Sequence, residues 1–261
     1  MAADTGWLNM PELGTLLVAG PAILAAYVVF GMISFGATLV AAPILAHVLP
    51  VSSVVPLMAV LDFLASCLNG FKLGSQVDLP ELRRLVPAML GGNIVGATIL
   101  FTLPTGLLSL GLALFVLGYA LDGLWRSRRA APPMAPLGAG WSWVFGGIGG
   151  SFSALFGAGG FLYAMYLARR LDQPLRIRAT QNAVLTVSSL IRVCIFIAAG
   201  RVFAWQQLAL VASVLPAMAL GLVVGHHITR ALDRRRFMQL LHGLILVTGT
   251  SLLLRSVWEL V

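Results

Sequence analysis

The chain has 261 residues, of which 59% are hydrophobic and only 10% are charged. An ordinary soluble domain has about 25% charged residues, so this composition excludes that class and indicates an all-α polytopic membrane protein. The net charge of +8 does not indicate nucleic-acid binding, because most basic residues stand in four short clusters between apolar segments. Basic residues in short loops mark the cytoplasmic side of a membrane protein.

In chain order, residues 1–13 are predicted to be an extracytoplasmic N-terminal segment, and residues 14–125 a first transmembrane repeat. The repeat opens with the uncharged run 14–49, which is too long for one helix. The run is interpreted as a re-entrant hairpin, and two full crossings are the alternative that the sequence leaves open. Single spans are then expected at 51–71, 85–103 and 105–125, with a polar basic loop at 72–84.

Residues 126–140 are predicted to be a basic, proline-rich cytoplasmic linker, and residues 141–261 a second transmembrane repeat. The repeat opens with 141–168, an uncharged stretch between two arginine-rich segments. It is too short for two crossings, which need roughly 20 residues each. Because both flanks are expected in the cytoplasm, it is predicted to enter the bilayer and turn back at 157–160. Three spans are expected after it, at about 179–199, 205–225 and 238–256.

Two motifs recur in order in the two halves. Phe35-Gly36-Ala37 returns as Phe156-Gly157-Ala158, and Pro87-Ala-Met-x-x-Gly92-x-x-Val95-Gly96 returns as Pro216-Ala-Met-x-x-Gly221-x-x-Val224-Gly225. If both hairpins return to their own side, all four basic clusters lie in the cytoplasm, whereas single crossings would divide them. The prediction is therefore two inverted repeats, each a re-entrant or broken helical hairpin plus three transmembrane helices, with both termini outside.

Inverted repeats with broken helices are typical of secondary transporters that hold their substrate near the bilayer midplane. The second half-helix of each hairpin would direct its N-terminal N–H groups and positive dipole at an anion there. The alternative is close helix packing through small residues. The candidate substrate-binding residues at the two tips are Gly36, Ala37, Thr38, Gly157, Gly159 and Gly160.

Two ionisable residues fall inside predicted spans. Asp62 is a candidate for carrying a coupling proton, or for a structural hydrogen bond. Arg192 is a candidate for contacting the anion, for pairing with Asp62, or for reaching the outer headgroups. Gln181, Asn182 and Ser188 are further candidate substrate-binding residues, with interhelical hydrogen bonds as the equal alternative.

The sequence shows no motif for a metal or a cofactor. There is no CxxC, no HExxH and no acidic cluster, so neither is expected. Cys67 and Cys194 fall in apolar segments and are expected to be small core residues rather than a disulfide. An intramembrane enzyme would need a nucleophile–base or metal pair on facing helices, and Asp62 with scattered serines does not supply one.

The chain resembles the TauE/SafE family of sulfite-exporter-like permeases over about residues 20–256. The resemblance rests on a duplicated glycine-rich segment that ends in an apolar run and a proline, GATLVAAPILAHVLP and then GAGGFLYAMYLARRLDQP. The helix start Arg178-Ala179-Thr180 and the turn Gly200-Arg201-Val202 add to it. The first repeat departs from the pattern, with Gly36-Ala37-Thr38 where three glycines are common. The resemblance implies transport of a small sulfur-containing or carboxylate anion.

The hypothesis is thus a multi-pass transporter or exporter in the cell (inner) membrane, with a small anion such as sulfite or a sulfoacetate-like organosulfonate as substrate. Its expected partners are that anion and the lipid bilayer, without nucleic acid. A membrane assembly or anchor protein without transport activity, and a transporter of an unrelated carboxylate, are the alternatives. The anion, the direction of transport, the coupling ion and whether the protein is a homo-oligomer are left open.

Overall fold

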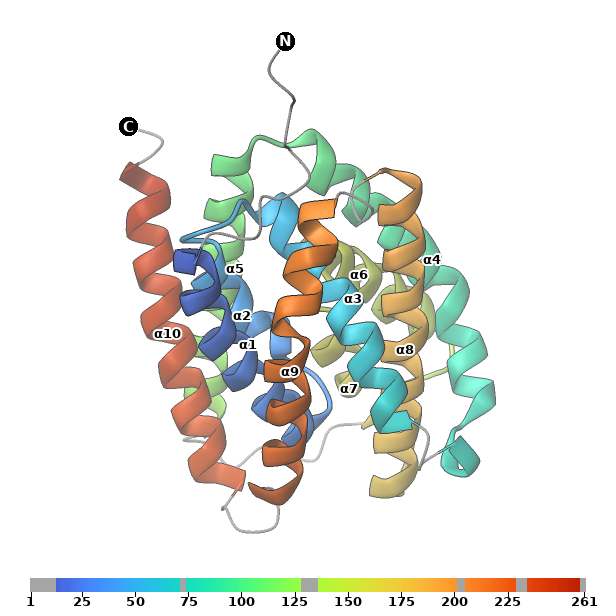
Figure 1. Ribbon diagram of the computed structural model, residues 1–261. Helices are drawn as coiled ribbons and strands as arrows, with labels where there is room; N and C mark the ends of the chain where they lie inside the picture. The colour runs from blue at the N-terminus through green and yellow to red at the C-terminus, as the bar shows by residue number, and fades with distance from the viewer. Residues whose placement is uncertain (1–12, 71–73, 128–135, 201–204, 229–233, 259–261) are drawn as a thin grey trace.

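The computed structural model describes residues 13–70, 74–127, 136–200, 205–228 and 234–258. Within these ranges the regular structure is entirely helical (Figure 1). The first half contains α1 (Leu13–Ile33), α2 (Ala37–Leu45), α3 (Val51–Gly70), a short 3₁₀ turn (Gly74–Gln76), α4 (Leu79–Thr102) and α5 (Thr105–Ser127). The second contains α6 (Trp141–Phe156), α7 (Gly160–Leu167), α8 (Pro174–Ala198), α9 (Trp205–Ile228) and α10 (Arg234–Trp258).

Seven of the described helices are long and apolar enough to cross a membrane, judged by length and composition: α1, α3, α4, α5, α8, α9 and α10. The prediction of an all-α polytopic membrane protein is therefore confirmed. The sequence predicted six single spans. The seventh span-length helix is α1, the first part of the predicted 14–49 hairpin, which has 21 residues. Its partner α2 has only 9 residues, which is well below the roughly 20 that a crossing needs.

Both predicted hairpins are broken helices. In the second hairpin, α6 has 16 residues and α7 has 8, so neither has the length of a crossing. The chain breaks at Gly157, where φ is +66°, and in the first hairpin at Gly36, where φ is +89°. Glycine adopts this left-handed backbone without a steric penalty, which ends one helix and frees the chain to turn.

The helices run in alternating directions in Figure 1. In that view α3 and α5 run downward and α4 upward, whereas α8 and α10 run upward and α9 downward. The α1–α2 pair enters from the upper end, where α3 also begins, and α6–α7 is seen behind α3, between α9 and α8 in that view. The inverted relationship of the two repeats stays a prediction. The orientation of the two halves relative to the bilayer stays a prediction.

The repeated Pro-Ala-Met motif packs each half against the hairpin of the other half. Helix α4 lies against α6, and α9 lies against α1. A Cβ atom at Gly92 would overlap the Gly147 carbonyl of α6, and one at Gly225 would overlap the Val28 carbonyl of α1. Small residues let helix backbones approach closely in a membrane. The duplication seen in the sequence therefore corresponds to two equivalent helix contacts.

Two sequence expectations are corrected. Helix α4 begins at Leu79, so the second part of the predicted loop 72–84 is helical. The Asp78 side chain accepts a hydrogen bond from the Glu81 N–H at 3.1 Å, which caps the helix N-terminus. Both cysteines are free, as expected, but neither is buried in the core: Cys67 is partly exposed and Cys194 is exposed.

Candidate functional site

The tips of the two hairpins meet inside the bundle. A Cβ atom at Gly157 would overlap the Thr38 side chain, and one at Gly160 would overlap Phe35. The first tip therefore lies directly on the second. Glycine at these positions permits the approach, which the larger residues common in helices would block.

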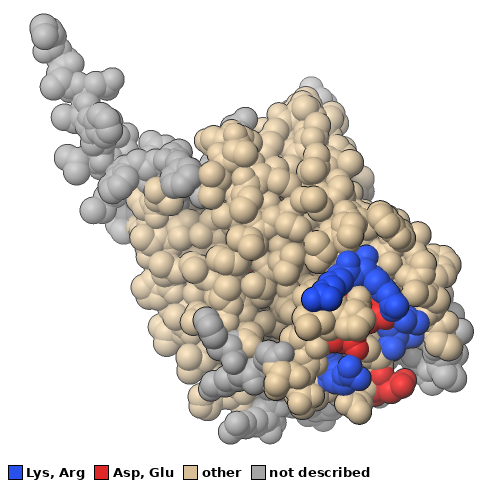
Figure 2. Space-filling view, turned by 90° about the vertical axis from the view of Figure 1, so that its right-hand side faces the viewer, with Lys and Arg blue, Asp and Glu red and all other residues tan. Residues whose placement is uncertain are grey.

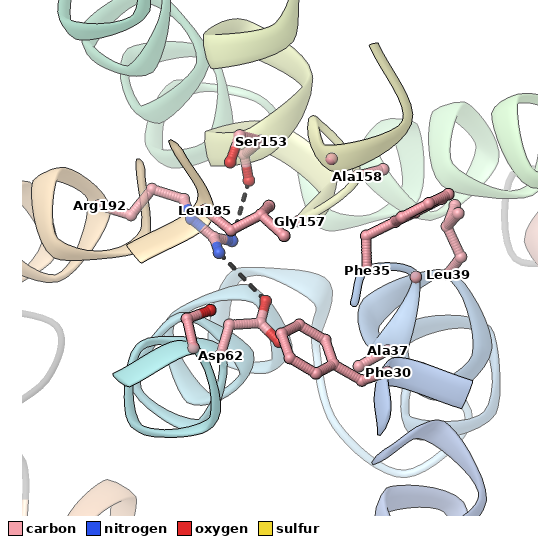
Figure 3. A pocket seen from close by; sticks show the side chains of 13 residues that line it. Phe30, Phe35, Ala37, Leu39, Asp62, Ser153, Gly157, Ala158, Leu185 and Arg192 are labelled. Carbon is pink, nitrogen blue, oxygen red and sulfur yellow. Dashed lines mark hydrogen bonds and ion pairs between the residues drawn. The ribbon is translucent and has the colours of Figure 1, made fainter. Parts of the chain in front are cut away.

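A small pocket lies between the tips and is shown in Figure 3. The backbone around Gly36 and Ala37 lines one side, and Gly157, Ala158 and Gly160 line another. Helix α3 adds Asp62 and Ser66, α6 adds Ser153, and α8 adds Leu185 and Arg192, while Phe30, Phe35 and Leu39 complete the wall. The centre of a water-sized sphere has about 20 Å³ of room, which is enough for a water molecule and too little for an organic anion.

The charged centre of the pocket is an ion pair between α3 and α8. The Arg192 Nη2 donates to the Asp62 Oδ2 at 3.1 Å, and the Arg192 side chain is only 3% exposed. The Tyr27 hydroxyl of α1 donates to Asp62 Oδ1 at 2.9 Å, and the Thr38 hydroxyl of α2 donates to Oδ2 at 3.2 Å. Both carboxylate oxygens therefore have donors, as a buried charge requires.

Arg192 also holds the second hairpin. Its Nη1 donates to the Ser153 carbonyl near the end of α6 at 3.1 Å, as the dashed line in Figure 3 shows. Its Nε is buried and has no hydrogen-bond partner. A guanidinium with an unused N–H beside two helix N-termini is suited to binding an anion, because the fork of donors matches a carboxylate or sulfonate.

The predicted site residues fall into two groups. Gly36, Ala37, Gly157, Gly160 and Arg192 line the pocket, together with Asp62. Thr38, Gly159, Gln181, Asn182 and Ser188 lie just behind this lining.

The residues behind the lining make structural contacts. The Gln181 Nε2 donates to the Gly160 carbonyl at 2.7 Å, and the Asn182 Nδ2 donates to the Ser66 carbonyl at 2.8 Å. Ser188 shares a 3.0 Å hydrogen bond with Ser153. The carbonyl oxygens of both amides are buried without a partner, so each amide keeps an unused acceptor.

Sequence reasoning missed three polar groups near the pocket: the Tyr27 hydroxyl, Ser66 and Ser153. Each stands in a largely apolar helix, and nothing in the local sequence tells which face of the helix it occupies. Tyr27 lies on the side of α1 that faces α3, as its bond to Asp62 shows.

A second polar cluster lies where α4 and α8 begin, and we call it the Glu81 cluster. Glu81 is 4% exposed and accepts from the Tyr166 hydroxyl at 2.7 Å, from Arg170 Nη2 at 2.7 Å and from Arg84 Nη1 at 2.7 Å. Beside it, Arg176 pairs with Asp78 at 2.8 Å. Figure 2 shows the charged side chains of this face gathered in one area, with the remaining described surface in that view uncharged.

Within the described residues, no group of three or more His, Cys, Asp or Glu side chains could hold a metal ion. The described pocket offers one carboxylate, which is already paired with a guanidinium.

Comparison with known proteins gives two matches. The family described as sulfite exporter TauE/SafE matches residues 19–252. A probable inner membrane transporter protein, TsaS of Comamonas testosteroni, is 27% identical over 198 residues, which cover 75% of this chain and 81% of that protein. No solved structure matches the chain.

Proposed function

Because the chain belongs to the sulfite exporter TauE/SafE family of membrane transporters, we propose that it moves a small anion, sulfite or an organosulfonate, by secondary transport. One observation carries this proposal: the two hairpin tips and the buried Arg192 side chain line the same pocket. The name of the TsaS relative supports placing the protein in the inner membrane as a transporter.

The chemistry of the pocket favours an anion. The N-termini of α2 and α7 begin at its wall, at Ala37 and Gly160. Helix N-termini attract negative charge through free N–H groups and the helix dipole. Arg192 adds a full positive charge with an unused N–H. In a site shielded from water, these groups act more strongly than they would at a surface.

The small size of the pocket indicates that the site must open before an anion binds. Sulfite and sulfonates are larger than the single water that the pocket accommodates. Binding therefore requires the two tips to separate, and each tip belongs to a different half of the chain. Alternating access follows if one half shifts against the other around this contact. The described structure then corresponds to a state closed around the site.

Uptake of labelled sulfite into proteoliposomes tests the proposal, with sulfoacetate, acetate and sulfate as competitors and protein-free liposomes as the blank. The pocket variant is Ala158→Leu, because Ala158 lines the pocket and is 3% exposed. The matched control is Ala219→Leu, since Ala219 is exposed on α9. Saturable uptake that is lost in Ala158→Leu and kept in Ala219→Leu is the expected result.

Two outcomes would contradict the proposal that the protein transports an anion through a site at the hairpin tips. Uptake that Ala158→Leu leaves unchanged would move the site away from the tips. A folded wild-type protein that carries none of these anions would favour an assembly or anchor role. Gly159→Leu is unsuitable as the pocket variant, because a Cβ atom at Gly159 would overlap the Gly149 carbonyl and disturb the hairpin itself.

A further inference from the structure

We infer that Asp62 and the transported anion compete for Arg192, so that one proton taken up by Asp62 accompanies each monovalent anion. The inference rests on the proposed function and adds its coupling ion and the charge of its substrate. It starts from the Asp62–Arg192 pair, which is the charged centre of the pocket that both hairpin tips line.

The first step is the surroundings of Asp62. The titratable and charged groups that face its carboxylate are Tyr27 from α1 and Arg192 from α8, and α2 adds the Thr38 hydroxyl. Helix α6 has no ionisable side chain, and the ionisable side chains of α9 are two histidines at its end. The nearest ones on α5, Tyr119 and Asp122, do not line the pocket. Arg192 is therefore the one positive charge that balances Asp62 within the described pocket.

The second step is the charge balance. The ionised pair is neutral overall, and its members are buried. Adding a monovalent anion would leave the pocket with one uncompensated negative charge in a medium where such charges are very unfavourable. If Asp62 takes up one proton from the solution, the pocket holding Arg192 and the anion is neutral again. The proton forms an O–H bond on the carboxyl, and no other bond forms or breaks.

The third step is hydrogen bonding. When protonated, the Asp62 Oδ2 no longer needs the Arg192 Nη2 as a donor. It can donate to the Thr38 hydroxyl, because a hydroxyl also accepts, and Tyr27 continues to donate to Oδ1 as it does at 2.9 Å. The Arg192 Nη2 is then free and joins the unpartnered Nε. Together they form the bidentate edge that binds a sulfonate or a carboxylate.

The same balance sets the charge of the substrate. With Asp62 protonated and uncharged, the single guanidinium of Arg192 neutralises a monoanion, such as a simple sulfonate, bisulfite or a monocarboxylate. A dianion such as sulfate would leave one negative charge uncompensated in the described pocket. We therefore expect monoanions to be preferred, and transport to be electroneutral, so that it follows the pH gradient and not the membrane potential.

The test uses methanesulfonate, which is a monoanion at all working pH values, and sulfate as the dianion. Proteoliposomes holding the wild-type protein receive a pH gradient that is acidic outside. Methanesulfonate should accumulate about tenfold for one pH unit, since a tenfold proton ratio is balanced by a tenfold anion ratio. A potassium potential set with valinomycin should not change this, and each anion should enter with one proton, measured by a pH electrode in weak buffer.

The variant Asp62→Asn separates coupling from binding. It should still exchange internal for external methanesulfonate, and it should no longer accumulate the anion in a pH gradient. Asp122→Asn is the control, because it makes the same change at an exposed carboxylate of α5 that does not line the pocket, so coupling should persist. Exchange by Asp62→Asn also shows that the variant is folded. If Asp62→Asn does not fold, the number of protons that enter with each anion through the wild-type protein tests the inference.

The outcomes are distinct. Wild-type transport of methanesulfonate without proton entry, or transport that follows the membrane potential, overturns the inference and leaves anion transport standing. Gradient-driven accumulation by Asp62→Asn also overturns it. Preference for sulfate over methanesulfonate overturns the charge rule. Absence of transport of any anion by the wild type, by contrast, contradicts the proposed function itself.

Discussion

Glu81 of α4 and Arg170 of the connection between α7 and α8 form a salt bridge, with Nη2 and Oε1 2.7 Å apart. The two residues belong to different halves of the chain. The Tyr166 hydroxyl of α7 donates to the other oxygen of the same carboxylate at 2.7 Å. The bridge therefore holds the second hairpin to a helix of the first half, at the end of the bundle where α4 and α8 begin.

Glu81→Gln should lower the stability of the folded protein. The substitution keeps the size of the side chain and leaves Tyr166, Arg170 and Arg84 without a charged acceptor. Leaving buried polar groups unsatisfied costs about 1–3 kcal/mol. Thermal unfolding in detergent should show a lower Tm than wild type. Asp172→Asn is the control, because this exposed carboxylate in the connection between α7 and α8 has no hydrogen bond or ion pair in the described structure. Equal Tm values for both variants would contradict the assignment.

Gly91 and Gly92 provide a second comparison with a built-in control. A Cβ atom at Gly91 meets nothing within 4 Å, whereas one at Gly92 would overlap the Gly147 carbonyl of α6. Gly91→Ala should be neutral, or stabilising by up to about 1 kcal/mol through helix propensity. Gly92→Ala should destabilise by about 1–3 kcal/mol, because α4 and α6 must move apart.

Thermal unfolding of the two alanine variants side by side measures this difference. The repeat makes the same prediction for Gly225→Ala, whose Cβ atom would overlap the Val28 carbonyl of α1. A Gly92→Ala protein as stable as Gly91→Ala would show that the α4–α6 contact is looser than the structure has it.

The positions of the two hairpins could be predicted from the sequence because several signals coincide there. Gly157 and Gly159 interrupt an apolar stretch that is too short for two crossings and has arginines on both sides. The start of α4 was missed because Arg83 and Arg84 were interpreted as loop residues. Asp78 followed by Pro80 and Glu81 is a helix-start pattern, and it marks the observed N-terminus.

The pairing of Asp62 with Arg192 was one of the interpretations that the sequence allowed, since both fall inside predicted spans. The contacts of Arg192 with Ser153 and of Asp62 with Tyr27 were not foreseen. They depend on how α1, α6 and α8 rotate about their axes. Those rotations are fixed by packing between the halves, through glycines such as Gly150 against Asn93, and single-helix patterns do not contain that information.

The single variant Arg192→Gln should be less stable than the double variant that combines Asp62→Asn with Arg192→Gln. The single change leaves an ionised carboxylate buried without its positive partner, and breaking a buried pair in this way costs about 3–5 kcal/mol. The double variant has no buried charge in the pocket. Thermal unfolding should give the order wild type, double variant, Arg192→Gln from high to low Tm. The double variant should fold and fail to transport, because no guanidinium remains for the anion. A double variant no more stable than Arg192→Gln would show that the two residues do not act as a pair.

The direction of the two halves in the membrane can be checked with single cysteines. Cys67 and Cys194 are first replaced by alanine, since Cys194 is exposed and would add background. A cysteine at Asp172, in the exposed connection between α7 and α8, should resist a membrane-impermeant thiol reagent added outside intact cells and react after the membrane is opened. A cysteine at Leu103, which is 43% exposed between α4 and α5, should react from outside.

This labelling pattern follows from the positive-inside rule, because Arg169, Arg170 and Arg176 lie beside Asp172. Labelling of the Asp172 position from outside would reverse or remove the predicted topology, and with it the side from which the second hairpin enters.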